Sequence, residues 1–484
     1  MPTRAASGCW WCCAFLLLAS LSLSARAETP RAELGKRLRR FEIAWQETDA
    51  DRRAAAVAPM TAAVRSFFTF QLSTAAKHLD EAWYSVRAEG APEASERAAI
   101  AMAVAATPLL ADTTAEMLSL KFAPFYEEAD DVAAAAPDPA GLRLSIVDAG
   151  GETLVDRRGD WAEIGGKIEW QTGPLPEGDH ALVVEHVGDA QTLEIARIGL
   201  SRVERLRQRL ETLEAAGGAW PEEAPPTSRA TVAAILALLE ALAASRGQET
   251  DFPAARMLQF AESLAAAGAA PAITIAAAAR GADLWLTLSD SRGEVPVRLR
   301  APADATGPLP VLFLHHGAGG SENMFFETCG AGRTATLGVE RGWLVVAPRQ
   351  GLFGLPLDVA AMLDVLEDSF DIDRTQVFLV GHSMGAGQVA KQVGLHPEAV
   401  AAAVALGGGA AAPAGEKAKQ VPWFVAAGAA DFGRPGAAAL AKRLEAAGAD
   451  VDSREYPDVE HMVIVQAALD DVFRFLDAVA AEPR

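Results

Sequence analysis

The segment from Val377 to Gly387 constrains the fold of this chain more than any other. An apolar run typical of a buried strand stops at Gly381, turns through Ser383 and continues as a helical pattern. In a G-x-S-x-G turn the serine is strained, and small residues two positions to either side, here Gly381 and Gly385, prevent backbone clashes. The segment therefore predicts a nucleophile elbow, with the serine hydroxyl in a cleft at the start of a helix. A five-residue motif alone has low specificity. The prediction therefore depends on whether the rest of the chain supplies a base, an acid and an oxyanion hole.

The elbow lies within an alternation of short apolar runs and helical patterns. Two alternating runs, Leu284 to Leu288 and Val295 to Leu299, flank a polar turn and predict an antiparallel hairpin. Further strands are expected at Val311 to Leu314, Trp343 to Ala347, Val377 to Val380, Ala401 to Leu406, Trp423 to Ala427 and Val451 to Tyr456. This alternation predicts an α/β fold with a mostly parallel sheet covered by helices on both faces. Ligands then bind at the carboxyl ends of the strands.

A glycine-rich loop, His315 to Ser321, follows the first of these parallel strands. An oxyanion hole needs backbone N–H groups aimed at the developing negative charge, and glycines allow the backbone to approach closely. We expect the donors to be the N–H groups of Met384 and Ala318, with Gly319 as the alternative to Ala318. A phosphate-binding loop is the competing interpretation, but the signatures G-K-[ST] and G-x-G-x-x-G are both missing here.

His461 is the predicted general base, because a serine hydroxyl needs a base to remove its proton during attack. It follows the last predicted strand and precedes a long terminal helix. The other histidines are excluded as the base by their positions in the sequence. His78, His180 and His186 belong to other modules, and we expect His180 and His186 to be surface or turn residues. His315 and His316 belong to the glycine-rich loop, His382 lies in the elbow and should point away from the site, and His396 lies at a helix end.

Asp431 is the predicted acid that orients the imidazole, since it follows the strand Trp423 to Ala427 in a glycine-containing turn. An aspartate in such a turn can also be a simple helix cap. Asp458 and Glu460 are rivals, but both lie so near His461 in sequence that they would reach its ring awkwardly. The resulting chain order is serine, aspartate, histidine.

With these motifs in place, residues 281–484 resemble an α/β-hydrolase of the small-esterase type, similar to carboxylesterases, acyl-protein thioesterases and polyhydroxybutyrate depolymerases or feruloyl esterases. The resemblance rests on Leu314 to Gly320, Gly381 to Gly385, Gly428 to Asp431 and Glu460-His461. It implies a serine esterase that forms an acyl-enzyme and uses neither a metal nor a cofactor. Phe325, Phe326 and Phe432 are candidates for an apolar substrate pocket, with core packing as the alternative for each. The stretch from Gly407 to Gln420 is too short for a sizeable lid, so any cover must come from elsewhere in the chain.

The first half of the chain carries no chemical motif. Residues 28–132 are expected to be helical, because apolar side chains such as Leu34, Leu38, Phe41 and Trp45 recur at helical spacing. Residues 140–200 alternate between polar and apolar positions and predict a small antiparallel β module. Residues 201–280 return to helical patterns and connect this module to the hydrolase-like domain.

Residues 1–27 have the features of a signal peptide: Arg4, an apolar stretch, and Ala25 and Ala27 at the cleavage position. A membrane anchor is the alternative, but the apolar run is shorter than the roughly 20 residues that span a bilayer comfortably. Three of the four cysteines lie in this segment, which leaves Cys329 without an internal disulfide partner. We therefore expect an exported protein, periplasmic or extracellular, with no stable membrane insertion after cleavage.

The charge of the chain excludes one class of partner. The formal net charge is −21, so long-range repulsion disfavours nucleic acid and anionic membranes. The leading hypothesis is a secreted serine hydrolase acting on a small-molecule or polymeric ester. Two alternatives remain open: a serine peptidase with the same fold, and a binding protein whose hydrolase domain is inert.

Overall fold

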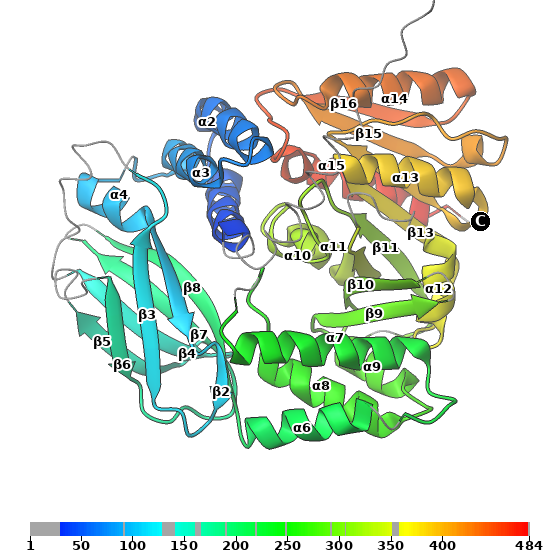
Figure 1. Cartoon of the computed structure of the whole chain (residues 1–484). Coiled ribbons are helices and arrows are strands. Elements are labelled where there is room, and N and C mark those ends of the chain that lie inside the picture. The colour runs from blue at the N-terminus through cyan, green and yellow to red at the C-terminus, as the bar shows by residue number, and fades with distance from the viewer. Residues whose placement is uncertain are drawn as a thin grey trace, which may run out of the picture.

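The computed structural model describes residues 30–90, 92–127, 141–159, 166–188, 191–217, 220–246, 249–290, 293–304, 306–350 and 358–482. The predicted signal peptide and its three cysteines lie outside these residues. Figure 1 shows a mixed α/β domain, a β-sandwich, and two helical groups that lie next to them.

An eight-stranded sheet forms the centre of the C-terminal domain, in the order β16-β15-β14-β13-β11-β12-β10-β9. Strands β11 to β16 pair in parallel, whereas β10 is antiparallel to both β9 and β12. Their bounds are β9 Leu284–Asp290, β10 Gly293–Arg300, β11 Leu309–His315, β12 Leu344–Pro348, β13 Ile372–His382, β14 Ala402–Leu406, β15 Trp423–Gly428 and β16 Val451–Tyr456. The predicted hairpin and the predicted parallel strands are confirmed.

Successive residues of the central strands enter two separate cores, because side chains alternate between the faces of a sheet. On β13, Leu379 joins the core that contains α12, α13 and α14, while Phe378 and Val380 join the core that contains α10, α11 and α15. These helices span α10 Met324–Glu327, α11 Arg333–Glu340, α12 Val359–Glu367, α13 Met384–Leu395, α14 Arg434–Ala447 and α15 Ile464–Ala480, with 3₁₀ turns at Pro397–Ala399 and Ala418–Gln420. Burial on both faces explains why the strands are continuously apolar.

The N-terminal helices cover residues 30–47, α2 Ala50–Phe68, α3 Leu72–Val86 and α4 Ala94–Ile100. The buried side chains of Leu38, Phe41 and Trp45 belong to the same core as α15. Polar contacts add to this packing. The buried carboxylate of Glu42 accepts hydrogen bonds from the backbone N–H groups of Cys329, at 3.0 Å, and Ala331, at 2.8 Å. The N-terminal helices are therefore part of the structure that surrounds the C-terminal sheet (Figure 1).

The expectation that helix extends to residue 132 is wrong beyond Ile100. Three strands follow, β1 Met102–Thr107, β2 Leu110–Asp112 and β3 Met117–Pro124, and they join β4 Leu142–Asp148, β5 Thr153–Gly159, β6 Lys167–Gln171, β7 Gly178–Val187 and β8 Thr192–Val203. One sheet has the order β1-β3-β6 and the other β2-β8-β7-β4-β5. Their inner faces share one apolar core, so the β module is a sandwich that begins earlier in the chain than predicted.

Two histidines expected at the surface of this module are instead buried. His180 and His186 lie in β7, with 7% and 0% of their surface exposed. The ring of His180 contacts the carbonyl oxygen of Pro176 through Nε2, at 2.9 Å. Alternation along β7 places both residues on one side of the strand, which is the reason for their burial.

Four helices connect the sandwich to the sheet: α6 Leu206–Gly217, α7 Pro226–Ala243, α8 Ala254–Ala267 and α9 Ala272–Ala279. Among the described residues, α7 alone is long and apolar enough to span a membrane. Its side chains Val232, Ile235 and Leu239 are buried in the core that also contains β9 and β10. This burial is typical of a core helix in a folded domain.

Candidate active site

Ser383 occupies a sharp turn between β13 and α13, as predicted. Its φ of 56° is rare for a residue with a side chain and indicates backbone strain. A Cβ atom on Gly381 would lie 2.3 Å from the carbonyl oxygen of Gly385, and one on Gly385 would lie 1.9 Å from that of His315. Only glycine fits at either position, so the sequence around Ser383 is dictated by this turn.

The structure brings Ser383, His461 and Asp431 together in one hydrogen-bonded chain. His461 lies after β16 and Asp431 after β15, so both follow the carboxyl ends of strands in the same parallel part of the sheet as β13. The Nε2 atom of His461 is 3.0 Å from Ser383 Oγ, and its Nδ1 atom is 2.7 Å from Asp431 Oδ1. The imidazole and the carboxylate are buried, while the serine is partly exposed. This geometry allows His461 to accept the serine proton while the carboxylate stabilises the imidazolium.

The two rival carboxylates do not contact the ring of His461. Asp458 is exposed, and the Glu460 carboxylate accepts a hydrogen bond from the Met462 N–H at 2.8 Å. Burial raises the pKa of Glu460 to about 8. Asp431, in contrast, also accepts a hydrogen bond from the Gly433 N–H at 2.6 Å, which fixes its Oδ1 atom toward the imidazole.

The three backbone N–H groups that are predicted to form the oxyanion hole have no protein acceptor among the described residues. Within the part of the chain that the structure describes, the N–H groups of Ala318, Gly319 and Met384 donate to no protein acceptor. Met384 is the first residue of α13, where helix N–H groups have no partner within the helix. Ala318 and Gly319 line the same cavity as Ser383. Two of these donors therefore belong to residues that line the cavity of Ser383, and the third belongs to the residue that follows Ser383.

His316 braces the loop that carries two of these donors. Its Nε2 atom accepts the Gln350 N–H at 2.9 Å, so its Nδ1 atom carries the proton and donates to the Gly317 carbonyl at 2.8 Å. Burial lowers the pKa of His316, which keeps the ring neutral in this tautomer. The buried His316 ring therefore fixes the conformation of the glycine-rich loop.

The expectation that His382 points away from the site is wrong. Its Nε2 atom is 2.9 Å from the backbone carbonyl of His461, and the two ring centroids are 4.7 Å apart. Burial lowers the pKa of His382 to about 3, so the ring is neutral and its Nε2–H donates to that carbonyl. His382 thus holds the backbone of His461 in place.

A second glycine cluster, Gly407 to Gly409, was missed by the sequence analysis. A Cβ atom on Gly407, where φ is +59°, would lie 2.7 Å from Asp431 Oδ2, and one on Gly408 would lie 2.3 Å from the carbonyl oxygen of Ser383. The run of three glycines directly after β14 was the available signal. These residues let the loop pass closely behind the serine and the aspartate.

Two of the three predicted pocket residues are core residues instead. Phe325 and Phe326 on α10 are 0% and 5% exposed and do not line the cavity at Ser383. Their short helix turns both rings toward the core shared with α15 and the N-terminal helices. Phe432 is 59% exposed, and its ring centroid lies 4.0 Å from that of His461. Phe432 therefore covers one side of the imidazole.

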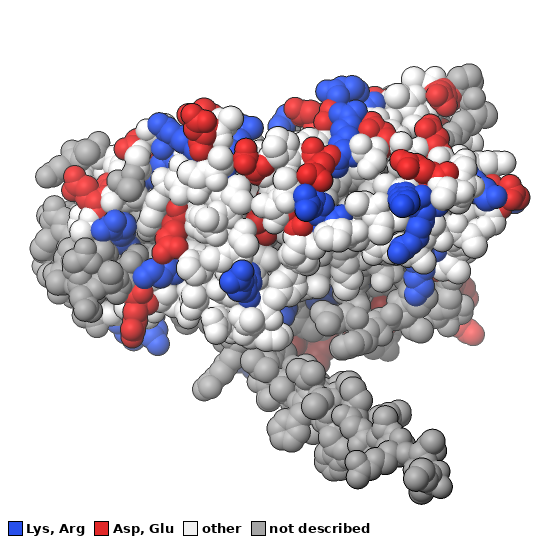
Figure 2. All heavy atoms as spheres, turned by 90° about the horizontal axis from the view of Figure 1, so that it is seen from above, with Lys and Arg blue, Asp and Glu red and all other residues white. Residues whose placement is uncertain are grey.

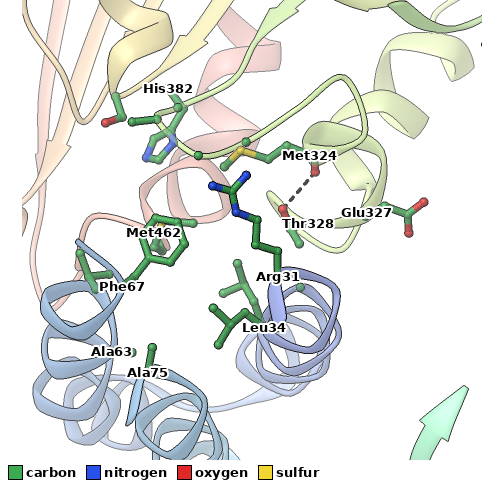
Figure 3. A pocket seen from close by; sticks show the side chains of 18 of the residues that line it. Arg31, Leu34, Ala63, Phe67, Ala75, Met324, Glu327, Thr328, His382 and Met462 are labelled. Atoms are coloured by element: carbon green, nitrogen blue, oxygen red, sulfur yellow. Dashed lines mark hydrogen bonds between the residues drawn. The ribbon is translucent and has the colours of Figure 1, made fainter. Parts of the chain in front are cut away.

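The cavity at Ser383 has a volume of about 190 Å³ and is walled on one side by the N-terminal helices. Figure 3 shows Arg31 and Leu34 from the helix at residues 30–47 and Phe67 from α2 facing Met324 and His382. A Cβ atom on Gly319 would lie 2.7 Å from the Phe67 ring, so α2 directly contacts the glycine-rich loop that is predicted to form the oxyanion hole. The expectation that any cover must come from outside the Gly407 to Gln420 segment agrees with this arrangement.

Charged side chains near the cavity are mostly paired. Glu249 accepts a hydrogen bond from Ser321, and Glu327 pairs with Arg39 at 3.1 Å and with Arg298 at 2.7 Å. On the face seen in Figure 2, basic and acidic side chains are intermixed over broad areas of other residues. This face has no large area of a single charge that would attract a polyanion.

Among known proteins, this chain is similar to solved structures. No family model matches the chain. No curated protein matches it either. A thermostable esterase is 22% identical with a TM-score of 0.35, and the match covers 40% of this chain and 62% of that one. A ferulic acid esterase is 18% identical with a TM-score of 0.36, covering 41% and 98%. A putative dienelactone hydrolase from Klebsiella pneumoniae subsp. pneumoniae is 19% identical with a TM-score of 0.33, covering 42% and 99%.

The architecture itself identifies the fold of the C-terminal domain. A mostly parallel sheet carries a strained serine on a strand-to-helix turn, and aspartate and histidine follow in that order on loops after later strands. Residues 284–480 therefore form a domain of the α/β-hydrolase fold, preceded by a helical region and a β-sandwich.

Proposed function

We propose that this protein is an exported serine hydrolase that cleaves carboxylic esters. The observation that carries this proposal is the chain of hydrogen bonds from Ser383 through His461 to Asp431, at the floor of a cavity that also holds free backbone N–H groups. Such an arrangement supplies a nucleophile, a base, an orienting acid and donors for an oxyanion.

The reaction proceeds in two halves. Ser383 Oγ attacks the ester carbonyl carbon while its proton moves to His461 Nε2, and the carbonyl oxygen becomes an oxyanion held by the N–H groups of Met384 and Ala318. The C–O bond to the alcohol then breaks, and His461 gives its proton to the leaving oxygen. Water attacks the acyl-enzyme with His461 as base, and the acid and free Ser383 are released.

A fluorophosphonate probe and 4-nitrophenyl acetate test this proposal together. We expect the wild type to be labelled and to release nitrophenolate, whereas Ser383→Ala should lose labelling and about 10⁶-fold in kcat, as for removal of a comparable nucleophile in subtilisin. A wild type that is not labelled, or equal labelling of the variant, would refute the enzyme proposal and favour an inert binding domain. Cleavage of peptides without any cleavage of nitrophenyl esters would favour a peptidase.

A further inference from the structure

The N-terminal helices contribute a wall to the cavity at Ser383 that is almost entirely apolar. Three elements supply it: the helix at residues 30–47, α2 and α3. Leu34, Met60 and Leu79 are each less than 10% exposed and face the cavity across from the oxyanion loop. A ligand pocket typically combines such an apolar wall with a few polar groups at the reacting end.

One face of the first helix lines this cavity. Arg31, Leu34, Gly35 and Leu38 all contribute to the lining, and their spacing of three and four residues places them on a single helical stripe. Figure 3 shows Leu34 directed from this helix into the space between it and Phe67 of α2. Arg31 is exposed, and Figure 3 shows its guanidinium group reaching from this helix across the cavity toward Met324 and His382, so the apolar part of the stripe is formed by Leu34, Gly35 and Leu38.

Gly35 leaves empty space within this stripe. Glycine is the weakest helix former after proline, and no turn or helix end explains it here, because helix continues on both sides. A Cβ atom at this position would meet nothing within 4 Å. A helix that packed only against its neighbours would fill such a position with a side chain. The missing side chain instead keeps the cavity open beside Leu34 and Leu38.

We propose that this wall is the acyl-binding site, and that the substrates are esters with an extended apolar acyl chain. The inference rests on the proposed ester hydrolysis and adds the substrate class and the residues that set it. With its carbonyl carbon at Ser383 Oγ, the ester directs its acyl chain away from the oxyanion loop and along α2 toward Gly35. Burial of each methylene group corresponds to about a fourfold gain in kcat/KM, equivalent to about 0.8 kcal/mol.

A chain-length series of 4-nitrophenyl esters, from acetate through butyrate and octanoate to dodecanoate, tests this proposal on the full chain. We expect kcat/KM of the wild type to rise from acetate to octanoate. Gly35→Phe should lower the ratio of kcat/KM for octanoate to kcat/KM for acetate about 50-fold, which corresponds to three methylene groups losing their burial.

Two further variants distinguish a blocked acyl site from a misfolded protein. Gly217→Phe makes the same chemical change at an exposed end of α6, where a Cβ atom also meets nothing within 4 Å, and should leave the profile unchanged. Ala63→Leu narrows the cavity from α2, which lines it together with the first helix, and should reproduce the loss on octanoate (Figure 3). Thermal melting of each variant verifies that it is folded.

The outcomes distinguish this inference from the proposed function. If the wild type is labelled by a fluorophosphonate and hydrolyses acetate, but Gly35→Phe keeps the wild-type chain-length profile, the acyl-site assignment is wrong and the hydrolase proposal stands. A wild type that does not prefer octanoate over acetate also overturns the assignment. If no ester is hydrolysed and no label is incorporated, the proposed function itself fails.

Discussion

Replacing Asp431 by asparagine tests how the carboxylate contributes to the reaction. The substitution keeps the shape of the side chain and removes its negative charge. The Oδ1 atom faces two donors in the native structure, the Gly433 N–H at 2.6 Å and His461 Nδ1 at 2.7 Å. An amide that turned its NH₂ group toward these donors would leave the Gly433 N–H without an acceptor, so we expect the asparagine to keep its carbonyl oxygen in place.

The expected fall in kcat follows from the removal of the negative charge of Asp431 alone. When the imidazole keeps its tautomer, the variant loses the attraction between the carboxylate and the imidazolium that forms during attack. For unit charges about 4 Å apart at an effective dielectric constant of about 20, this attraction is about 4 kcal/mol. At about 1.36 kcal/mol per factor of ten, kcat should fall about 10³-fold with little change in KM. An inverted tautomer would cost more, about 10⁴-fold, as observed in a serine protease.

Initial rates of 4-nitrophenyl acetate hydrolysis at saturating substrate measure this effect. Glu460→Gln is the matched control, because Glu460 is buried next to His461 in the sequence but contacts the Met462 N–H instead of the ring. We expect the control to lose less than about tenfold. An Asp431→Asn variant within about threefold of the wild type, or a control that loses as much as Asp431→Asn, would refute the role given to Asp431.

Three further changes have expected outcomes. Gly407→Ala should cost about 1–2 kcal/mol of stability at its φ of +59° and reduce kcat, because the new methyl group would lie 2.7 Å from Asp431 Oδ2; melting and ester hydrolysis measure the two effects. Burial raises the pKa of Glu42 to about 8, so the native state binds more protons than the unfolded chain between pH 4.3 and 8, and stability should fall as pH rises through that range. In Glu42→Gln, the free energy of unfolding should fall less between pH 5 and pH 8 than it does in the wild type, as measured by urea titrations at the two pH values. Asp80→Ala should lower the free energy of unfolding in urea titrations by about 3–5 kcal/mol. The reason is that the buried Arg37 loses the carboxylate that accepts a hydrogen bond from its Nε atom at 3.0 Å.

The three residues of the proposed triad could be located from the sequence because each follows a local rule. The glycines around Ser383 are required by one turn, and Asp431 and His461 follow strands that are recognisable from their apolar residues. Parallel strands place their carboxyl ends at one edge, so residues distant in the sequence meet there without any knowledge of packing. The position of His382 did not follow from such a rule, since its hydrogen bond depends on where the His461 backbone lies.

The strands at Met102–Thr107 and Met117–Pro124 show how tertiary packing overrides local preference. The first contains mainly alanine and methionine, which favour helix, and yet Val104 and Ala106 are buried in the sandwich core. In the second strand, Leu118, Leu120 and Phe122 alternate with exposed or half-buried residues, so a period of two was visible there. Reading the two segments as one helical stretch concealed that alternation.

The wall of the cavity depends on contacts that no local pattern encodes. Glu42 contacts the backbone of Cys329 and Ala331, which lie 287 and 289 residues further along the chain, and these contacts hold the first helix over the site. A buried carboxylate with two backbone donors is costly to place unless the donors are fixed, so the loop at Cys329 and the helix stabilise each other. The same helix carries Gly35, whose missing side chain keeps the cavity open. Anchoring and access to the site are thus combined in one helix, which makes this N-terminal region part of the candidate active site although it contributes no reacting group.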